Sequence, residues 1–260
     1  MRLPGLINSH AHLRVPGGEH KEDFRTGSMA ALAGGFTTVL AMPNTKPPLT
    51  RVDLWQEAQH KASTEALCNV HLMAGASGTD VEELFALSGR AVALKLYLDV
   101  TYGPLQVRGL RHLEAIFANW HAPKPICCHA EDESLAMVLG LAAAYSKPVH
   151  ICHVARQSEI ELIARAKREG LPVTCEVAPH HLFLTEKDAE SLGAYGDMRP
   201  RLQSAKDVAA LWQHINTTID VIADDHAPHA IWEKEGFAYE ADWQAAGSPC
   251  ALHGRPAVDA

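Results

Sequence analysis

Short apolar runs alternate along the chain with longer segments that carry apolar residues at helical spacing. The strand-like runs cover residues 5–13, 37–42, 69–74, 91–98, 125–130, 148–154, 172–178 and 220–225. Between them, segments such as residues 158–170 repeat apolar positions three or four residues apart, which is typical of amphipathic helices. Eight strand–helix units in succession predict a parallel α/β sheet, and this number favours a closed (β/α)8 barrel of the TIM type.

A doubly wound open sheet is the competing arrangement. It usually carries a Gly-rich phosphate loop after its first strand, and the sequence contains neither a GxGxxG motif nor a P-loop. We therefore prefer the barrel. Local signals mark several helix starts as capping boxes, and Gly170 is expected to end the helix that begins near residue 158. The predicted capping boxes pair Ser158 with Glu161, Thr79 with Glu82, and Ser204 with Asp207.

The regular alternation ends at Gly236. Residues 237–260 show no strand or strong helix pattern, so we expect one catalytic domain over residues 1–236 followed by an atypical, disordered tail. A truncated or frame-shifted gene model would explain this tail. We expect the closure of the barrel to be compromised, which would weaken or abolish activity.

The charge balance and the cysteines restrict the function classes. The formal net charge is -8, with acidic and basic residues interspersed, which argues against a nucleic-acid binder. The chain shows no signal peptide and no apolar run long enough to cross a membrane. The six cysteines lack zinc-finger or CxxC spacing. Free cysteines fit a reducing compartment, so we expect a cytoplasmic protein.

His10 and His12 stand two residues apart at the end of the first strand-like run, and Arg14 follows them. Side chains two apart in a strand point to the same face, so both imidazoles would converge on one point, as a shared metal ion requires. With 16 histidines in the chain, such a pair also arises by chance. The other strand ends decide between these interpretations.

Polar side chains recur where the other strands end, at the edge where barrel enzymes collect reactive groups. They are Asn44, Lys95, His129, His153, Asp225 and His229. This repetition favours a metal site. For the sixth strand, periodicity does not choose between His150 and His153.

Lys95 is flanked by apolar residues and should point into the barrel. One interpretation pairs it with a buried carboxylate such as Asp225. The other is a neutral amine, because burial lowers the pKa of lysine. A neutral amine can add carbon dioxide and become a carbamate, which is an anion able to bridge two cations.

Seven short motifs occur along the chain in the same order as in a known protein family. They are GLINSHAHLRVPG, AMPNTKPP, LKLYL, CCHAE, HICHVAR, GLPVTCEVAPHHLFL and DDHAPH. Over residues 3–236 the chain resembles the dihydroorotases of the amidohydrolase superfamily. The nearest likeness is to the dihydroorotase part of the animal multifunctional pyrimidine-synthesis protein and its bacterial relatives.

The resemblance implies a pair of zinc ions and a reaction. His10, His12 and Asp225 would hold one zinc ion, and His129 with His153 the other. Lys95, as its N6-carboxylated form, would bridge both. The reaction would be the reversible closure of N-carbamoyl-L-aspartate to (S)-dihydroorotate in pyrimidine biosynthesis, with Asp225 as the catalytic acid and base.

The resemblance also implies a substrate site. Arg14, Asn44 and His229 would bind the carboxylate of the substrate, and Arg14 offers a planar fork suited to it. Thr101 matches a mobile loop that closes over the substrate, and Arg199 matches another substrate-side position. A third metal near Cys152 and Glu176 is a further hypothesis.

Asn8 departs from the family pattern, which has Asp two residues before the first histidine. A neutral amide still forms hydrogen bonds, but it lacks the negative charge that a carboxylate would lend to a histidine ligand. The relatives also carry a small β-rich segment before the barrel and a different continuation after DDHAPH.

Two other functions remain open. A hydantoinase, dihydropyrimidinase or allantoinase would share the two-metal barrel and open other cyclic amides. A non-catalytic relative that binds aspartate transcarbamoylase would instead have lost metal ligands, whereas all six positions remain here. Association with aspartate transcarbamoylase and a homodimer are the partners we expect besides the substrate.

Overall fold

Parallel strands follow one another in chain order and pair with their neighbours. The computed structural model describes residues 3–77, 80–103 and 105–235. The strands are β1 (Leu6–Ala11), β2 (Phe36–Ala41), β3 (Asn69–Leu72), β4 (Ala74–Gly75), β5 (Leu94–Tyr97), β6 (Ile126–His129), β7 (Val149–Ile151), β8 (Val173–Val177) and β9 (Val221–Ile222). They form one sheet of order β1-β2-β3 and another of order β4-β5-β6-β7-β8-β9. The predicted strands are thus confirmed in position, and most of them are shorter than expected.

The strand predicted over residues 69–74 is divided at Met73 into β3 and β4. Met73 donates its backbone N–H to the carbonyl of Ala41, whereas Ala74 donates to Ala93. The two halves therefore pair with opposite neighbours, and the division places the third strand of the series between the two sheets.

The beginning and the end of the strand series also meet. Ala11 forms an isolated parallel bridge with His226, and the backbone N–H of His12 donates to the carbonyl of His226 over 2.7 Å. The loop after β9 consequently lies beside the end of β1, which brings residues more than 200 positions apart to one place.

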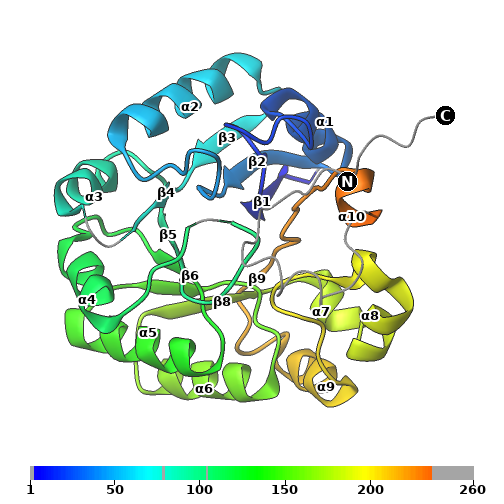
Figure 1. Ribbon diagram of the computed structural model, residues 1–260. Helices are drawn as coiled ribbons and strands as arrows, with labels where there is room; N and C mark the ends of the chain where they lie inside the picture. Colours follow the sequence, from blue (N-terminus) through cyan, green and yellow to red (C-terminus); the bar gives the residue numbers. More distant parts are fainter. Residues whose placement is uncertain (1–2, 78–79, 104, 236–260) are drawn as a thin grey trace.

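Helices surround the strands on the outside (Figure 1). They are α1 (Phe24–Ala33), α2 (Val52–Glu65), α3 (Val81–Ser88), α4 (Leu110–Asn119), α5 (Asp132–Tyr145), α6 (Gln157–Arg168), α7 (Pro179–Phe183), α8 (Glu186–Leu192), the 3-10 turn η1 (Gly193–Gly196), α9 (Ala205–His214) and α10 (Ile231–Glu235). This alternation of parallel strands and helices is an α/β fold.

The helix starts confirm one of the predicted capping boxes. Ser204 caps α9, and its side chain bonds to Asp207 as expected. The box predicted for Ser158 and Glu161 is wrong, because α6 starts earlier and Glu159 accepts the backbone N–H of Arg156.

The other two signals concern α3 and the end of α6. At α3 the cap is Asp80, whose carboxylate accepts the N–H of Glu83, and Thr79 lies outside the described residues. Gly170 follows α6 with φ of +81°, a backbone conformation that glycine adopts without strain, as its predicted role requires.

Two apolar regions hold the layers together. The larger one lies between strands and helices and includes Phe24, Leu94, Leu96 and Phe117, which are fully buried. Each such side chain stabilises the fold by about 1.5–3 kcal/mol relative to an exposed position. The smaller region gathers short or flexible side chains from successive strands. Its members are Met42, Met73, Ala93, Cys127 and Cys152.

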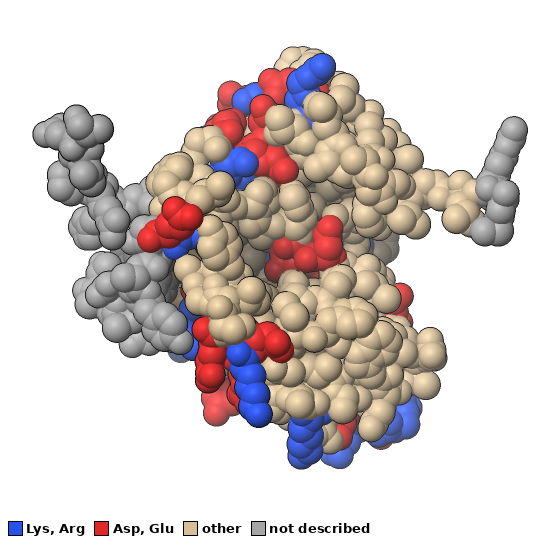
Figure 2. All heavy atoms as spheres, turned by 90° about the vertical axis from the view of Figure 1, so that its right-hand side faces the viewer, with Lys and Arg blue, Asp and Glu red and all other residues tan. Residues whose placement is uncertain are grey.

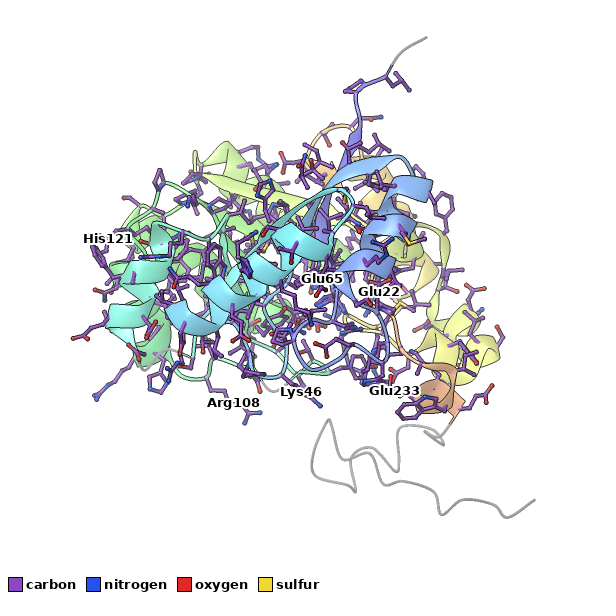
Figure 3. The ribbon with its side chains drawn as sticks, turned by 90° about the horizontal axis from the view of Figure 1, so that it is seen from above. Glu22, Lys46, Glu65, Arg108, His121 and Glu233 are labelled. Carbon is purple, nitrogen blue, oxygen red and sulfur yellow. The ribbon has the colours of Figure 1, made fainter. Side chains whose placement is uncertain are left out.

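The loops that follow the strands gather on one side of the molecule. Lys46 after β2, Arg108 after β5 and Glu233 after β9 lie along the same edge when the molecule is seen from above (Figure 3). This is the edge at which the carboxyl ends of parallel strands place functional side chains.

Charged side chains of both signs are interspersed on the surface, as they are along the sequence. The face drawn in Figure 2 carries acidic and basic side chains in small groups, and acidic side chains line a hollow near its middle. Among the described residues, no helix combines the length and apolar character needed to span a membrane. The predicted tail over residues 237–260 lies outside the described residues.

Candidate metal centre

His10, His12 and Asp225 converge as predicted. His10 lies in β1, His12 comes directly after it, and Asp225 follows β9. The Nε2 atoms of both histidines lie 3.1 Å from Asp225 Oδ1. The three side chains offer nitrogen and oxygen atoms within 4.8 Å of one another, a spacing compatible with a shared metal ion.

The other ring nitrogen of each histidine has its own acceptor. His12 Nδ1 donates to Asn44 Oδ1 over 2.8 Å, and His10 Nδ1 donates to Glu176. Such outer partners fix the tautomer and the orientation of a metal-binding imidazole. Both Nε2 atoms are therefore directed at the same point.

His129 and His153 form a second pair. His129 ends β6, His153 follows β7, and His129 Nδ1 lies 3.0 Å from His153 Nε2. Two nitrogens bound to one tetrahedral zinc ion at the usual bond length would lie about 3.3 Å apart. His150 instead contacts Thr174 and Glu176, so His153 is the histidine that lies beside His129.

Lys95 is fully buried on β5. Its Nζ donates to Cys152 Sγ over 2.9 Å, so the alternative pairing with Asp225 is not observed. Burial lowers the pKa of Lys95, but Cys152 and Tyr97 outweigh that effect and raise it above the usual value. These two neighbours thus favour the charged amine, whereas addition of carbon dioxide requires the neutral one.

Burial and neighbouring charges together set the protonation of the histidines and of Asp225. Burial lowers the pKa of His12 to about 4 and that of His153 well below its usual value, so both imidazoles stay neutral. Burial also opposes ionisation of Asp225, yet His10 and His12 hold its pKa well below the usual range. Burial likewise disfavours a charged His10, but Asp225 and Glu176 raise its pKa, so a metal would displace a proton there.

The backbone is strained at three of the predicted site residues. Arg14, His153 and Asp225 have φ of 62°, 34° and 50°, values that non-glycine residues seldom adopt. Each such residue costs on the order of 1 kcal/mol or more, and such strain tends to cluster at functional sites. All three residues lie two or three positions beyond the end of a strand.

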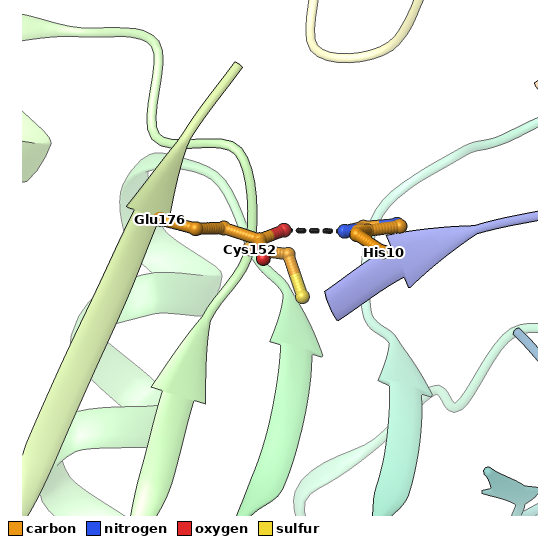
Figure 4. A group of neighbouring side chains, drawn as sticks. All are labelled: His10, Cys152 and Glu176. Atoms are coloured by element: carbon orange, nitrogen blue, oxygen red, sulfur yellow. Dashed lines mark hydrogen bonds and ion pairs between the residues drawn. The ribbon is translucent and has the colours of Figure 1, made fainter. Parts of the chain in front are cut away.

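Glu176 has a larger role than the sequence indicated. It is buried on β8 and faces His10, with Cys152 beside them (Figure 4). It also accepts from His150 Nε2 over 3.1 Å. His10, Cys152 and Glu176 form a second group that could hold a metal ion. The resemblance had indicated Cys152 and Glu176 only as the place of a third metal, and the contacts of Glu176 with His10 and His150 were not predicted.

The predicted carboxylate-binding residues lie beside the metal centre. Arg14 donates its Nε–H to the carbonyl of Pro228 over 2.9 Å, while its buried Nη2 has no hydrogen-bond partner among the described residues. Asn44 contacts His12, as described above. His229 Nδ1 lies 3.2 Å from Lys21 Nζ and 3.3 Å from Glu233 Oε2.

The loop that contains Thr101 lies over this region. Thr101 is half-buried, and the ring of the next residue, Tyr102, lies 5.3 Å from the guanidinium of Arg199 and 6.0 Å from the ring of His229. A side chain at Gly103 would approach Asn44 to 3.2 Å. Sequence reasoning missed Tyr102, although it joins the loop to two predicted site residues.

Comparison with known proteins assigns the chain to a family. The model of the amidohydrolase family matches residues 1–226. The chain belongs to the amidohydrolase family. The metal-binding groups described above all lie inside the matched residues, as do Arg14 and Asn44, whereas His229 follows them.

Curated relatives of this amidohydrolase include dihydroorotases. The chain is 48% identical over 235 residues to the multifunctional protein CAD of Squalus acanthias, covering 90% of this chain and 10% of that protein. It is 36% identical over 264 residues to the dihydroorotase of Pelobacter propionicus, covering 90% of this chain and 62% of that enzyme. The chain thus spans less than two thirds of these relatives.

Solved structures share the fold. The L-hydantoinase (dihydropyrimidinase) from Arthrobacter aurescens matches with a TM-score of 0.85 and 25% identity, over 90% of this chain and 60% of that one. The inactive dihydroorotase-like domain of the Chaetomium thermophilum CAD-like multifunctional protein matches with a TM-score of 0.72 and 28% identity. That match covers 85% of this chain and 63% of the other.

Proposed function

We propose that this amidohydrolase is a zinc-dependent dihydroorotase, which interconverts N-carbamoyl-L-aspartate and (S)-dihydroorotate in pyrimidine biosynthesis. The observation that carries the proposal is the meeting of two histidine groups near buried Lys95, together with Arg14, whose buried Nη2 has no hydrogen-bond partner among the described residues. The identity to curated dihydroorotases supports the same activity.

The side chains present fit a pair of metal ions. His10, His12 and Asp225 would hold one zinc ion, and His129 with His153 would hold the other. His153 Nδ1 is buried with no hydrogen-bond partner among the described residues, which leaves that ring free to reorient toward a metal. Bound zinc would supply Lewis acidity toward water and the substrate carbonyl.

Lys95 would bridge the two ions as a carbamate. The ammonium first loses a proton to solvent water; the amine nitrogen then attacks carbon dioxide, a nitrogen–carbon bond forms as one carbon–oxygen π pair moves onto oxygen, and a second proton passes from the nitrogen to water. Because Cys152 favours the ammonium form of Lys95, we expect the modification to accompany metal binding. The carbamate then replaces a cation with an anion between the two histidine groups.

Asp225 would move the proton in the reaction. In the hydrolytic direction it accepts a proton from the attacking water and returns it to the ring nitrogen as the carbon–nitrogen bond breaks. Its carboxylate is ionised in the resting protein, as a general base must be. Arg14, Asn44 and His229 would hold the substrate carboxylate, with Thr101 and Arg199 on the loops above it.

We extend the proposal to the architecture and the partners. The contact between the end of β1 and the loop after β9 supports a (β/α)8 barrel of the TIM type within residues 1–236, with an atypical C-terminal closure. The described cysteines are free, which supports a cytoplasmic location.

Homology to CAD suggests association with aspartate transcarbamoylase, and a homodimer remains part of the proposal. The group of His10, Cys152 and Glu176 would take a third metal ion.

The decisive experiment compares zinc-loaded protein on dihydroorotate, hydantoin and allantoin side by side, with zinc content measured on the same sample. We expect about two zinc ions per chain and a preference for dihydroorotate, which alone of the three bears the carboxylate that Arg14 suits. A preference for hydantoin would replace the assignment by a hydantoinase. Absence of zinc and of turnover would favour a non-catalytic partner of aspartate transcarbamoylase.

A further inference from the structure

The hydroxyl of Tyr97 is a buried polar group without a hydrogen-bond partner among the described residues. The residue is 2% exposed. Burying a hydroxyl that has lost water and gained no partner costs about 1–3 kcal/mol. Natural proteins seldom retain such a group unless something outside the folded chain uses it.

Tyr97 lies on the face of β5 that points toward the metal centre. Leu94 and Leu96, on the opposite face, belong to the core between strands and helices. Lys95 and Tyr97 alternate with them and share the inner face. The centre of the Tyr97 ring lies 5.0 Å from Lys95 Nζ.

The register of the sheet places Tyr97 level with a proposed metal ligand. Tyr97 pairs with His129 across β5 and β6, and their rings are 6.4 Å apart. Both residues are the last of their strands. Tyr97 therefore lies two residues nearer than Lys95 to the carboxyl-end edge of the sheet, from which a substrate would enter. The Tyr97 ring therefore lies beside two of the proposed metal-site residues, Lys95 and His129.

Two buried donors in this region lack acceptors, namely the Tyr97 hydroxyl and Arg14 Nη2. A ligand that brings two acceptors would satisfy both donors. The proposed substrate has a carboxylate, which suits the charged guanidinium, and an amide carbonyl, which suits a neutral donor beside the metal ligands.

We propose that Tyr97 donates a hydrogen bond to the oxygen of the scissile amide carbonyl while that oxygen gains negative charge. This inference rests on the proposed function and adds a substrate-contacting residue to it. As the water oxygen bonds to the carbonyl carbon, the π pair moves onto the carbonyl oxygen, and the Tyr97 O–H stabilises it without transferring its proton. The carbonyl re-forms as the carbon–nitrogen bond breaks, and the nitrogen takes the proton held by Asp225.

The test is the variant Tyr97→Phe in the zinc-loaded protein, assayed on dihydroorotate and on hydantoin. We expect kcat to fall about 10- to 100-fold with little change in KM, because the donor acts chiefly on the charge of the transition state. Zinc content should equal that of the unmodified protein. Tyr145→Phe on α5, which removes a hydroxyl far from the strands' carboxyl ends, should retain full activity.

A second measurement does not depend on turnover. Without substrate, Tyr97→Phe should leave the melting temperature unchanged or raise it, because the hydroxyl has no partner to lose. A lowered melting temperature would reveal a structural partner and overturn the proposal, as would a raised KM at constant kcat. A chain that opens hydantoin alone would refute the dihydroorotase assignment, yet a kcat loss there in Tyr97→Phe would still support Tyr97 as the carbonyl donor.

Discussion

Asn8 donates its side-chain N–H to Asp224 Oδ1 over 2.8 Å and so joins the first strand to the loop after the last one. Its carbonyl oxygen simultaneously accepts the backbone N–H of His10. Only an amide can serve both contacts, because an ionised carboxylate has no hydrogen to donate. The departure from the family pattern at Asn8 thus has a local reason, because the carboxylate of Asp224 faces this side chain and needs a donor.

Replacing Asn8 with Asp should destabilise this contact. Two carboxylates would face one another at neutral pH, and we expect the free energy of unfolding to fall by about 1–3 kcal/mol. The loss should shrink below about pH 4, where a protonated carboxyl donates again. Chemical denaturation at several pH values measures this. Asn69→Asp at an exposed position makes the same charge change and should have little effect, and equal stability of both variants at pH 7 would refute the account.

Removing a histidine from one pair should release metal from that pair. We expect His129→Ala to lower zinc content from about two to about one ion per chain and to reduce kcat/KM by at least about 100-fold, since the remaining ion lacks its partner. Elemental analysis and the dihydroorotate assay check both expectations. His121→Ala, on an exposed loop away from the centre, should keep all of its zinc. Full zinc occupancy in His129→Ala would show that the ligand assignment is wrong.

Arg14 should discriminate between substrates by charge. Arg14→Lys keeps the charge but loses the planar fork, so we expect kcat/KM for dihydroorotate to fall about 10- to 100-fold, the value of one or two charged hydrogen bonds. Activity on hydantoin, which has no carboxylate, should change far less. Arg51→Lys is the matched control, because that side chain is exposed and pairs only with Asp53 among the described contacts. An equal loss on both substrates would argue against carboxylate recognition.

The positions of the strands could be predicted because strands buried on both faces appear as continuous apolar runs. Their lengths could not, since the last residues of several runs leave the sheet. His153 and Asp225 show this clearly, as both follow short strands and turn inward through a positive φ. Periodicity records which residues are apolar, but not where backbone pairing stops.

The residues of the candidate site also fall into those that the sequence predicts and those that it does not. His10, His12 and Lys95 carry their signal in local spacing and in the apolar residues around them. The contacts of Glu176 with His10 and of Tyr102 with Arg199 join segments far apart in sequence, so no local pattern announces them. The contact of Lys95 with Cys152 is of the same kind, because Cys152 approaches Lys95 from the end of another strand.

Glu233 should make the stability of the protein depend on pH. Its side chain is 4% exposed and accepts from His20 over 3.0 Å and from Lys21 over 3.1 Å, while its other oxygen faces His229. Although burial opposes ionisation, these partners lower the pKa of Glu233 to about 2. The folded pKa is thus below the value of about 4.3 expected in the unfolded chain. The stabilisation is therefore present above about pH 4.3 and is lost as the pH falls through about 2.

Glu233→Gln should remove this dependence. We expect it to lower the free energy of unfolding by on the order of 1–2 kcal/mol at pH 7, through weaker hydrogen bonds to Lys21 and His20, and the deficit should vanish near pH 2. Denaturant titrations of both proteins between pH 7 and pH 2 provide the measurement. Glu57→Gln, exposed on α2, makes the same change without these partners and should follow the unmodified protein. A deficit that stays constant with pH would mean that Glu233 stabilises the fold by packing, independently of its charge.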